Sequence, residues 1–165
     1  MNEATMTTSA GPTYGRRHPF RFLEQGSAQT LREGMAEFAA AHPDLLAPDE
    51  PELARFFYAH DACHVLFGLT TFLDDEALAD VWTMLATDIP VRRYFDYLKY
   101  PELRALVIDV GVGKALWGAL RAAPRMWRAW RVSRRMRERW PFLGYGQHMD
   151  TPLAELRARF GVRVV

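Results

Sequence analysis

Apolar residues recur every three or four positions along most of the chain, which is the spacing of one face of an α-helix. In the first such segment, Leu31, Met35 and Phe38 predict a helix over residues 28–40. The stretch that follows, residues 42–51, contains three prolines and is typical of a loop. No run of valine, isoleucine and threonine alternates with polar residues over a length that would form a sheet.

Helix-start and helix-stop residues frame two further helices in the middle of the chain. The first should run from Pro51 to Phe67, because proline suits the first helical position and Gly68 suits the position after the last. Asp74 and Asp75 then predict the N-cap region of a helix that reaches about Thr87. The two helices are joined by a short connection, so they should lie close together.

Prolines divide the second half of the chain. Pro90 opens a short helix. Pro101 and Pro124 bracket a long apolar segment, residues 103–123, which predicts one helix with Gly111 and Gly113 as weak points. A basic helix should follow and end near Trp140.

The last helix carries clear boundary signals, with Thr151 as its cap, Pro152 in its first turn and Gly161 at its end. A chain of 165 residues with 49% hydrophobic content can bury one core. The sequence therefore predicts an all-α fold, a single compact helical domain of about six to eight helices over residues 19–165. Residues 1–18 have loop composition and should form a flexible tail.

Composition narrows the class of protein. The formal net charge of +1 is not that of a polyanion-binding protein, so no nucleic-acid partner is expected. The single cysteine, Cys63, cannot form an internal disulfide and fits a reducing compartment. No apolar run is long enough to span a bilayer, and residues 1–11 lack the apolar stretch of a secretory signal. We therefore expect a cytoplasmic location, with peripheral contact to the cytoplasmic face of a membrane as an alternative.

One short stretch, "HDACHVLFGLTTFLDDE", carries the candidate chemistry. His60 and His64 lie one helical turn apart, and Asp61 falls within the same arc of roughly 100°. The connection after Gly68 then brings Glu76 back from the first turn of the next helix. Two imidazoles and two carboxylates form a mixed nitrogen–oxygen ligand set, which suits zinc, iron, manganese or cobalt.

The histidines have a structural interpretation as well, because they share a stripe with apolar residues, and core histidines are more often hydrogen-bonded residues than ligands. However, burying two imidazoles with two carboxylates is costly unless a cation or close pairing offsets the cost. No lysine or arginine lies within residues 60–76 to pair with them. A divalent metal ion is therefore the better account of His60, Asp61, His64 and Glu76.

The motif His-Asp-x-x-His, eleven residues, then Glu resembles the signature of the Coq4 family of ubiquinone-biosynthesis proteins. His60, Asp61, His64 and Glu76 occupy its four positions. The continuation "VLFGL" and the C-terminal "YGQHMDTPLAELRARFGV" (residues 145–162) are also similar to the family.

The resemblance implies an all-helical fold in which the four motif residues hold one divalent metal ion, usually described as zinc, beside a hydrophobic cavity for a polyprenylated ring. It implies a role in decarboxylating and hydroxylating the ring precursor and in organising other enzymes at the membrane. The expected partners are a prenylated substrate or lipid, other quinone-pathway enzymes and a second copy in a homodimer. Two alternatives are a non-catalytic prenyl-lipid-binding scaffold at the membrane surface and a Coq4-like enzyme that acts on another quinone or a secondary metabolite.

A basic, tryptophan-rich segment is a second candidate for contact with other molecules. Residues 114–139 contain nine lysines and arginines and one acidic residue. One interpretation is an interfacial helix, with arginines on anionic lipid and tryptophans at the headgroup level. The other is an ordinary surface helix with its tryptophans in the core. The residues expected to contact lipid are Arg121, Arg125, Trp127, Arg128 and Trp130.

A His-Asp doublet also occurs in His-Asp phosphohydrolases. These enzymes need a further upstream histidine and a distant downstream aspartate. His42 lies in a predicted loop, which disfavours this assignment.

Overall fold

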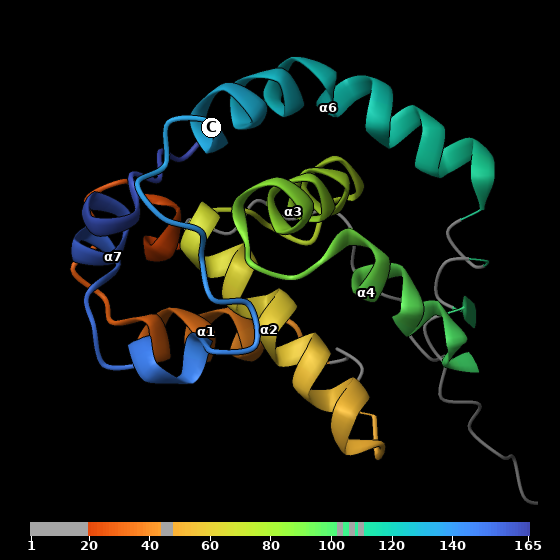
Figure 1. Ribbon diagram of the computed structural model, residues 1–165, viewed down its shortest axis with the longest axis horizontal. Helices are drawn as coiled ribbons and strands as arrows, with labels where there is room; N and C mark the ends of the chain where they lie inside the picture. The colour runs from red at the N-terminus through yellow and green to blue at the C-terminus, as the bar shows by residue number, and fades with distance from the viewer. Residues whose placement is uncertain (1–19, 44–47, 102–103, 106–107, 109–110) are drawn as a thin grey trace, which may run out of the picture.

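Figure 1 shows a computed structural model of the chain, and its all-α architecture confirms the predicted fold class. The structure describes residues 20–43, 48–101, 104–105, 108 and 111–165, so the predicted tail over residues 1–18 lies outside it. The helices of the described residues, with η for a 3₁₀ helix, are η1 (Arg21–Leu23), α1 (Leu31–Ala41), α2 (Pro51–Phe67), α3 (Leu73–Ala86), α4 (Val91–Asp96), η2 (Tyr97–Lys99), α6 (Val112–Ser133), η3 (Tyr145–His148) and α7 (Leu153–Phe160).

α1 begins at Leu31, later than predicted, because a capping box fixes its start. The Thr30 side chain accepts a hydrogen bond from the Glu33 backbone N–H, and the Glu33 carboxylate accepts one from the Thr30 backbone N–H. These reciprocal bonds satisfy N–H groups that a helix start leaves without partners. α1 packs against α2, where the ring of Phe38 stacks on that of His64 with 5.2 Å between centroids.

The connection between α2 and α3 is fixed by one glycine and one aspartate. Gly68 ends α2 as predicted, in the left-handed region with a φ of 70°. The N-cap of α3 is Phe72, so Asp74 and Asp75 lie in the first turn and not in the N-cap region. Asp75 accepts hydrogen bonds from the backbone N–H (2.8 Å) and the hydroxyl (2.6 Å) of Thr70. This closed turn positions the start of α3 over α2.

A buried arginine joins the C-terminal helix to the rest of the domain. Arg157 of α7 has 0% of its surface exposed and donates hydrogen bonds to the backbone carbonyls of Phe22, Glu24, Val65 and Leu66. Burial lowers the pKa of its guanidinium to about 10. Two of the carbonyls belong to the last turn of α2, where a helix leaves carbonyl groups without internal donors. Arg157 therefore fixes the end of α2.

α6 differs most from the prediction. It runs through Pro124 without interruption, so the predicted apolar helix and the predicted basic helix are one element. It begins after Gly111, which has a φ of 73°, and the earlier part of the predicted helix, residues 103–110, lies partly outside the described residues. It ends at Ser133, whereas Trp140 is fully buried in the core. Proline removes one backbone donor, and α6 continues past it as an arch over α3 (Figure 1).

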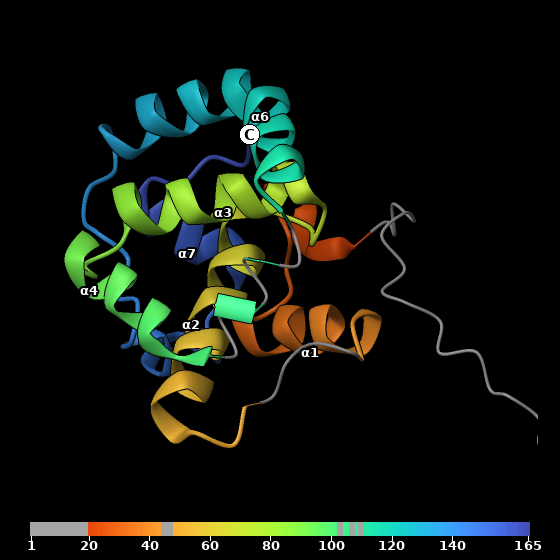
Figure 2. The ribbon, with the colours of Figure 1, turned by 90° about the vertical axis from the view of Figure 1, so that its right-hand side faces the viewer.

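α7 closes the domain against the start of α1. Its N-cap is Pro152 and not Thr151 as predicted, and Gly161 ends it as predicted with a φ of 75°. The backbone N–H of Leu153 donates to the carbonyl of Gln29 at 2.7 Å. In the view turned by 90°, α6 lies above α3, and α3 lies above α2 (Figure 2). Within the described residues, no helix combines the length and apolar character needed to cross a membrane.

Candidate metal centre

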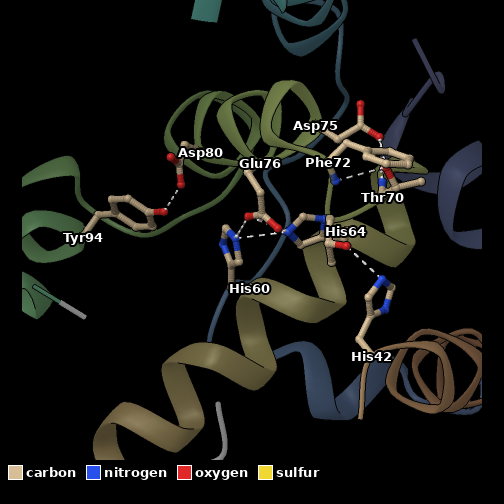
Figure 3. A network of polar contacts seen from close by, with 10 residues as sticks. His42, His60, His64, Thr70, Phe72, Asp75, Glu76, Asp80 and Tyr94 are labelled. Carbon is tan, nitrogen blue, oxygen red and sulfur yellow. Dashed lines mark hydrogen bonds and ion pairs between the residues drawn. The ribbon is translucent and has the colours of Figure 1, made fainter. Parts of the chain in front are cut away.

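Three polar side chains converge between α2 and α3. His60 and His64 project from consecutive turns of α2, and Glu76 points toward them from the first turn of α3 (Figure 3). The Nε2 atoms of the histidines are 3.2 Å apart, and Glu76 Oε2 lies 3.6 Å from His60 Nε2 and 3.4 Å from His64 Nε2. The three atoms thus form a nearly equilateral triangle.

The triangle has the size that a metal ion requires. An ion bound tetrahedrally at about 2.0–2.1 Å separates its ligand atoms by about 3.3 Å. Within the described residues, His60, His64 and Glu76 form a group of side chains that could hold a metal ion. Two imidazole nitrogens and one carboxylate oxygen are also the donor set of many catalytic zinc sites. The residues present therefore fit a divalent ion.

The orientation of the two imidazole rings supports this assignment. Within the described residues, Nδ1 of His60 and Nδ1 of His64 are buried without a hydrogen-bond partner. Both rings instead direct Nε2 at Glu76, although this brings the two Nε2 atoms against each other. A cation between them would give all three ligand atoms a common partner. The exposed fraction of the side chain is 1% for His64, 13% for His60 and 38% for Glu76, so the centre opens on the Glu76 side.

The histidines and Glu76 also shift one another's pKa values when no ion is bound. Burial lowers the pKa of His60, but the hydrogen bond and negative charge of Glu76 outweigh it and raise that pKa to about 9. Burial raises the pKa of Glu76, but the two histidines hold it well below its ordinary value. Without a metal ion, the site would therefore hold a protonated His60 paired with an ionised Glu76.

Asp61, the fourth predicted ligand, is not part of the triangle. It lines a hollow of about 370 Å³ on the surface, together with Tyr58 of α2 and residues of α1 and the η3 region. The other lining residues are Met35, Ala36, Ala39, Tyr145 and Met149. Burial raises the pKa of the Asp61 carboxyl. Its role as a ligand stays a prediction.

A second acidic side chain lies beside the centre and was not singled out from the sequence. Asp80 is one turn after Glu76 on α3, and the Tyr94 hydroxyl of α4 donates to its Oδ1 at 2.5 Å (Figure 3). Burial raises the pKa of Asp80, and the positive charge of His60 opposes that rise. The spacing of four residues places Asp80 on the same helix face as Glu76, so the sequence could have indicated it. No local pattern indicates that Tyr94 would bind Asp80.

The remaining candidates near the motif have structural roles. His42 has both ring nitrogens occupied, because Nδ1 contacts the Phe38 carbonyl at 2.7 Å and Nε2 contacts the Thr71 hydroxyl at 2.8 Å. It lies outside the triangle, contrary to the requirement of a His-Asp phosphohydrolase centre. Cys63 is buried, and burial raises the pKa of its thiol to about 12, so it has the character of a core residue.

The residues predicted to contact lipid divide into two groups. Arg121, Trp127, Arg128 and Trp130 are exposed on α6. Arg125 points inward, where it forms an ion pair with Asp75 and donates to the Val165 carbonyl at 3.1 Å and 3.3 Å. Because protein groups hold its guanidinium, Arg125 is not available to contact lipid, contrary to the prediction.

Comparison with protein-family models, with curated proteins and with solved structures gives no match to this chain. The geometry of the centre and the sequence motif therefore carry the functional argument.

Proposed function

We propose that this chain is a Coq4-like, metal-dependent protein of ubiquinone biosynthesis that takes part in decarboxylating or hydroxylating a polyprenylated aromatic ring precursor. The observation that carries the proposal is the triangle of His60 Nε2, His64 Nε2 and Glu76 Oε2, with sides of 3.2, 3.4 and 3.6 Å. The resemblance of the motif to the Coq4 family supplies the pathway and the substrate class.

In this proposal, His60, His64 and Glu76 hold one divalent ion, with zinc as the first candidate and iron, manganese or cobalt as others. The ion would supply a Lewis acid for an oxygen substituent of the ring. Because Glu76 is the most exposed of the three ligands, the ring would approach from its side. Asp80, held through one oxygen by Tyr94, would accept a proton or a hydrogen bond with the other.

Metal analysis of the purified protein tests the centre. We expect about one equivalent of metal in the wild type and a large loss in His64→Ala, because His64 contributes one of three ligand atoms. His148→Ala is the matched control, since His148 lies in η3 outside the triangle. Equal and negligible metal in the wild type and in His64→Ala would refute the proposal.

A non-catalytic, prenyl-lipid-binding scaffold is the second candidate function. Two observations favour it: the His60–Glu76 pair can be charge-balanced without an ion, and the hollow beside Asp61 is lined mainly by apolar side chains. A complementation assay separates the two functions. If His60→Ala still supports quinone synthesis in cells that lack the normal gene, the scaffold is correct. If the wild-type gene alone fails to restore quinone synthesis, a Coq4-like enzyme acting on another quinone or a secondary metabolite becomes the better assignment.

A further inference from the structure

The two faces of α6 have the reverse of the usual arrangement. Its inner face, against α3, is built from small buried residues: Gly118, Ala122 and Ala129. Five of its large apolar side chains point outward, with exposed fractions of 60% for Leu116, 63% for Trp117, 60% for Leu120, 59% for Trp127 and 38% for Trp130. A surface helix of a globular protein normally buries such side chains and exposes polar ones. The tryptophans are therefore not core residues, which removes the ordinary-surface-helix interpretation.

The small inner residues explain why the large residues are left outside. A Cβ atom on Gly118 would lie only 2.8 Å from Leu73 Cγ and 3.2 Å from the Leu73 carbonyl oxygen. At Gly118, α6 therefore lies too close to α3 for any side chain. Glycine and alanine at the closest approach, with the partly buried Met126 and Val132, pack α6 on the domain, and the exposed leucines and tryptophans take no part in that packing.

A row of cations borders the exposed apolar face. Lys114, Arg121 and Arg128 are seven residues apart, which places them along one edge of α6. All three are exposed, as is Arg131 near the C-terminal end. The rings of Trp127 and Trp130 stack with 4.7 Å between centroids. α6 contains no aspartate or glutamate over residues 112–133.

We propose that the outer face of α6 docks on an anionic lipid bilayer, with the helix axis parallel to the membrane surface. Leucine and tryptophan side chains would enter the boundary between headgroups and acyl chains, while the bordering cations meet lipid phosphates. Figure 1 shows α6 as an arch over α3, so the outer face, which is turned away from α3, lies on the convex side. The inference goes beyond the proposed function and does not depend on the metal centre.

Charge decides between a bilayer and a second copy of the chain. A symmetric dimer through this face would bring two rows of cations together with no acidic residue of α6 between them. An anionic bilayer offers a partner for both kinds of side chain on this face: an apolar interior for the leucines and tryptophans, and negative charge for the cations. We therefore assign the face to lipid, and self-association becomes an outcome of the test.

Co-sedimentation with lipid vesicles tests the proposal on the full chain. The probes are vesicles of phosphatidylcholine alone and vesicles of equal parts phosphatidylcholine and phosphatidylglycerol. We expect the wild type to bind the anionic vesicles, to bind the neutral ones much more weakly, and to lose affinity as salt is raised. Binding should persist after treatment with a chelator, so failure of this test is distinguishable from failure of the metal centre.

Two double variants separate the apolar and the ionic contributions. Arg121→Gln/Arg128→Gln should weaken binding to anionic vesicles by about thirtyfold, at about tenfold per 1.4 kcal/mol and about 1 kcal/mol per cation. Leu120→Gln/Trp127→Gln keeps the charge and should reduce binding to both vesicle types at any salt concentration. The matched control is Arg92→Gln/Arg93→Gln, which removes two exposed cations of α4.

Three results would overturn the assignment. The first is equal binding of the wild type to neutral and anionic vesicles. The second is an equal effect of the α4 and α6 arginine variants. The third is a dimer in sedimentation velocity that Leu120→Gln/Trp127→Gln converts to a monomer, because a second copy would then cover the face. All of the substituted side chains are exposed or border the exposed face, so each variant should unfold at the wild-type temperature.

Discussion

Replacing Arg157 by methionine should destabilise the domain by about 3 kcal/mol. Methionine fills much of the same volume but supplies no donor to the four carbonyls that the guanidinium contacts. The Glu24 carbonyl keeps the Ser27 backbone N–H at 3.0 Å. The carbonyls of Phe22, Val65 and Leu66 would be left buried without the guanidinium.

The magnitude follows from two opposing contributions. Each buried carbonyl left without a donor costs about 1–2 kcal/mol, so the three together cost roughly 3–6 kcal/mol. Removing the arginine also removes the cost of burying its charge, a cost that is visible in the lowering of its pKa to about 10. Because this recovery offsets part of the loss, we expect a net change near the lower end of the range.

Urea unfolding measures the effect. With an m value of about 2 kcal/mol/M, a loss of about 3 kcal/mol lowers the midpoint by about 1.5 M urea at unchanged m. Arg159→Met is the matched control on the same helix, because Arg159 is exposed and pairs with Glu138 at the surface, which predicts a change within about 0.5 kcal/mol. If Arg157→Met falls in the same range as this control, the four hydrogen bonds do not stabilise the fold and the argument is wrong.

Three further pairs of variants test the centre and the packing of the helices around it. Glu76→Gln should lower zinc affinity by at least about tenfold in competition with a chelator, and Asp61→Asn by less, since Asp61 lies outside the triangle. Equal losses would show that Asp61 is a ligand as well. Gly68→Ala should lower the free energy of unfolding in urea by about 1–2 kcal/mol, because φ is 70° and the new Cβ would lie 2.8 Å from Val164 Cγ1. Gly26→Ala, whose Cβ would have nothing within 4 Å, should leave it nearly unchanged. Gly118→Ala should speed amide hydrogen exchange in α6, because the new Cβ would push the helix away from Leu73. Gly113→Ala, also on α6 but in open space, should slow the exchange, because alanine favours the helix over glycine. The opposite order would contradict the packing of α6 on α3.

The features that the sequence predicts correctly are those encoded over a few residues. The end of α2 follows from Gly68, whose left-handed conformation is local, and the end of α7 follows from Gly161 in the same way. The spacing of His60 and His64 by four residues is likewise a property of one helix. These signals needed no knowledge of what packs against the helices, which is why they survive in the structure.

The features that the sequence does not reveal depend on contacts between distant segments. Arg157 lies in an amphipathic helix two residues before the exposed Arg159, and nothing local marks it as the buried one of the two. Arg125 shares the spacing of the other arginines of its helix, yet it turns inward because Asp75 lies below it. Pro124 predicted a helix boundary, but the packing of α6 along α3 outweighs the loss of one backbone donor.

The first turn of α3 connects these observations, because neighbouring residues there face different partners. Asp75 binds Thr70 of the connection and Arg125 of α6, and Glu76 binds the histidines of α2. Successive helical residues differ by about 100°, so the bonds of Asp75 set the direction in which Glu76 points. Removing one residue from the connection would bring Ala77 to the place of Glu76 and Glu76 to that of Asp75. The eleven-residue spacing between His64 and Glu76 is therefore a geometric requirement of the centre, and α6 helps to enforce it through Arg125.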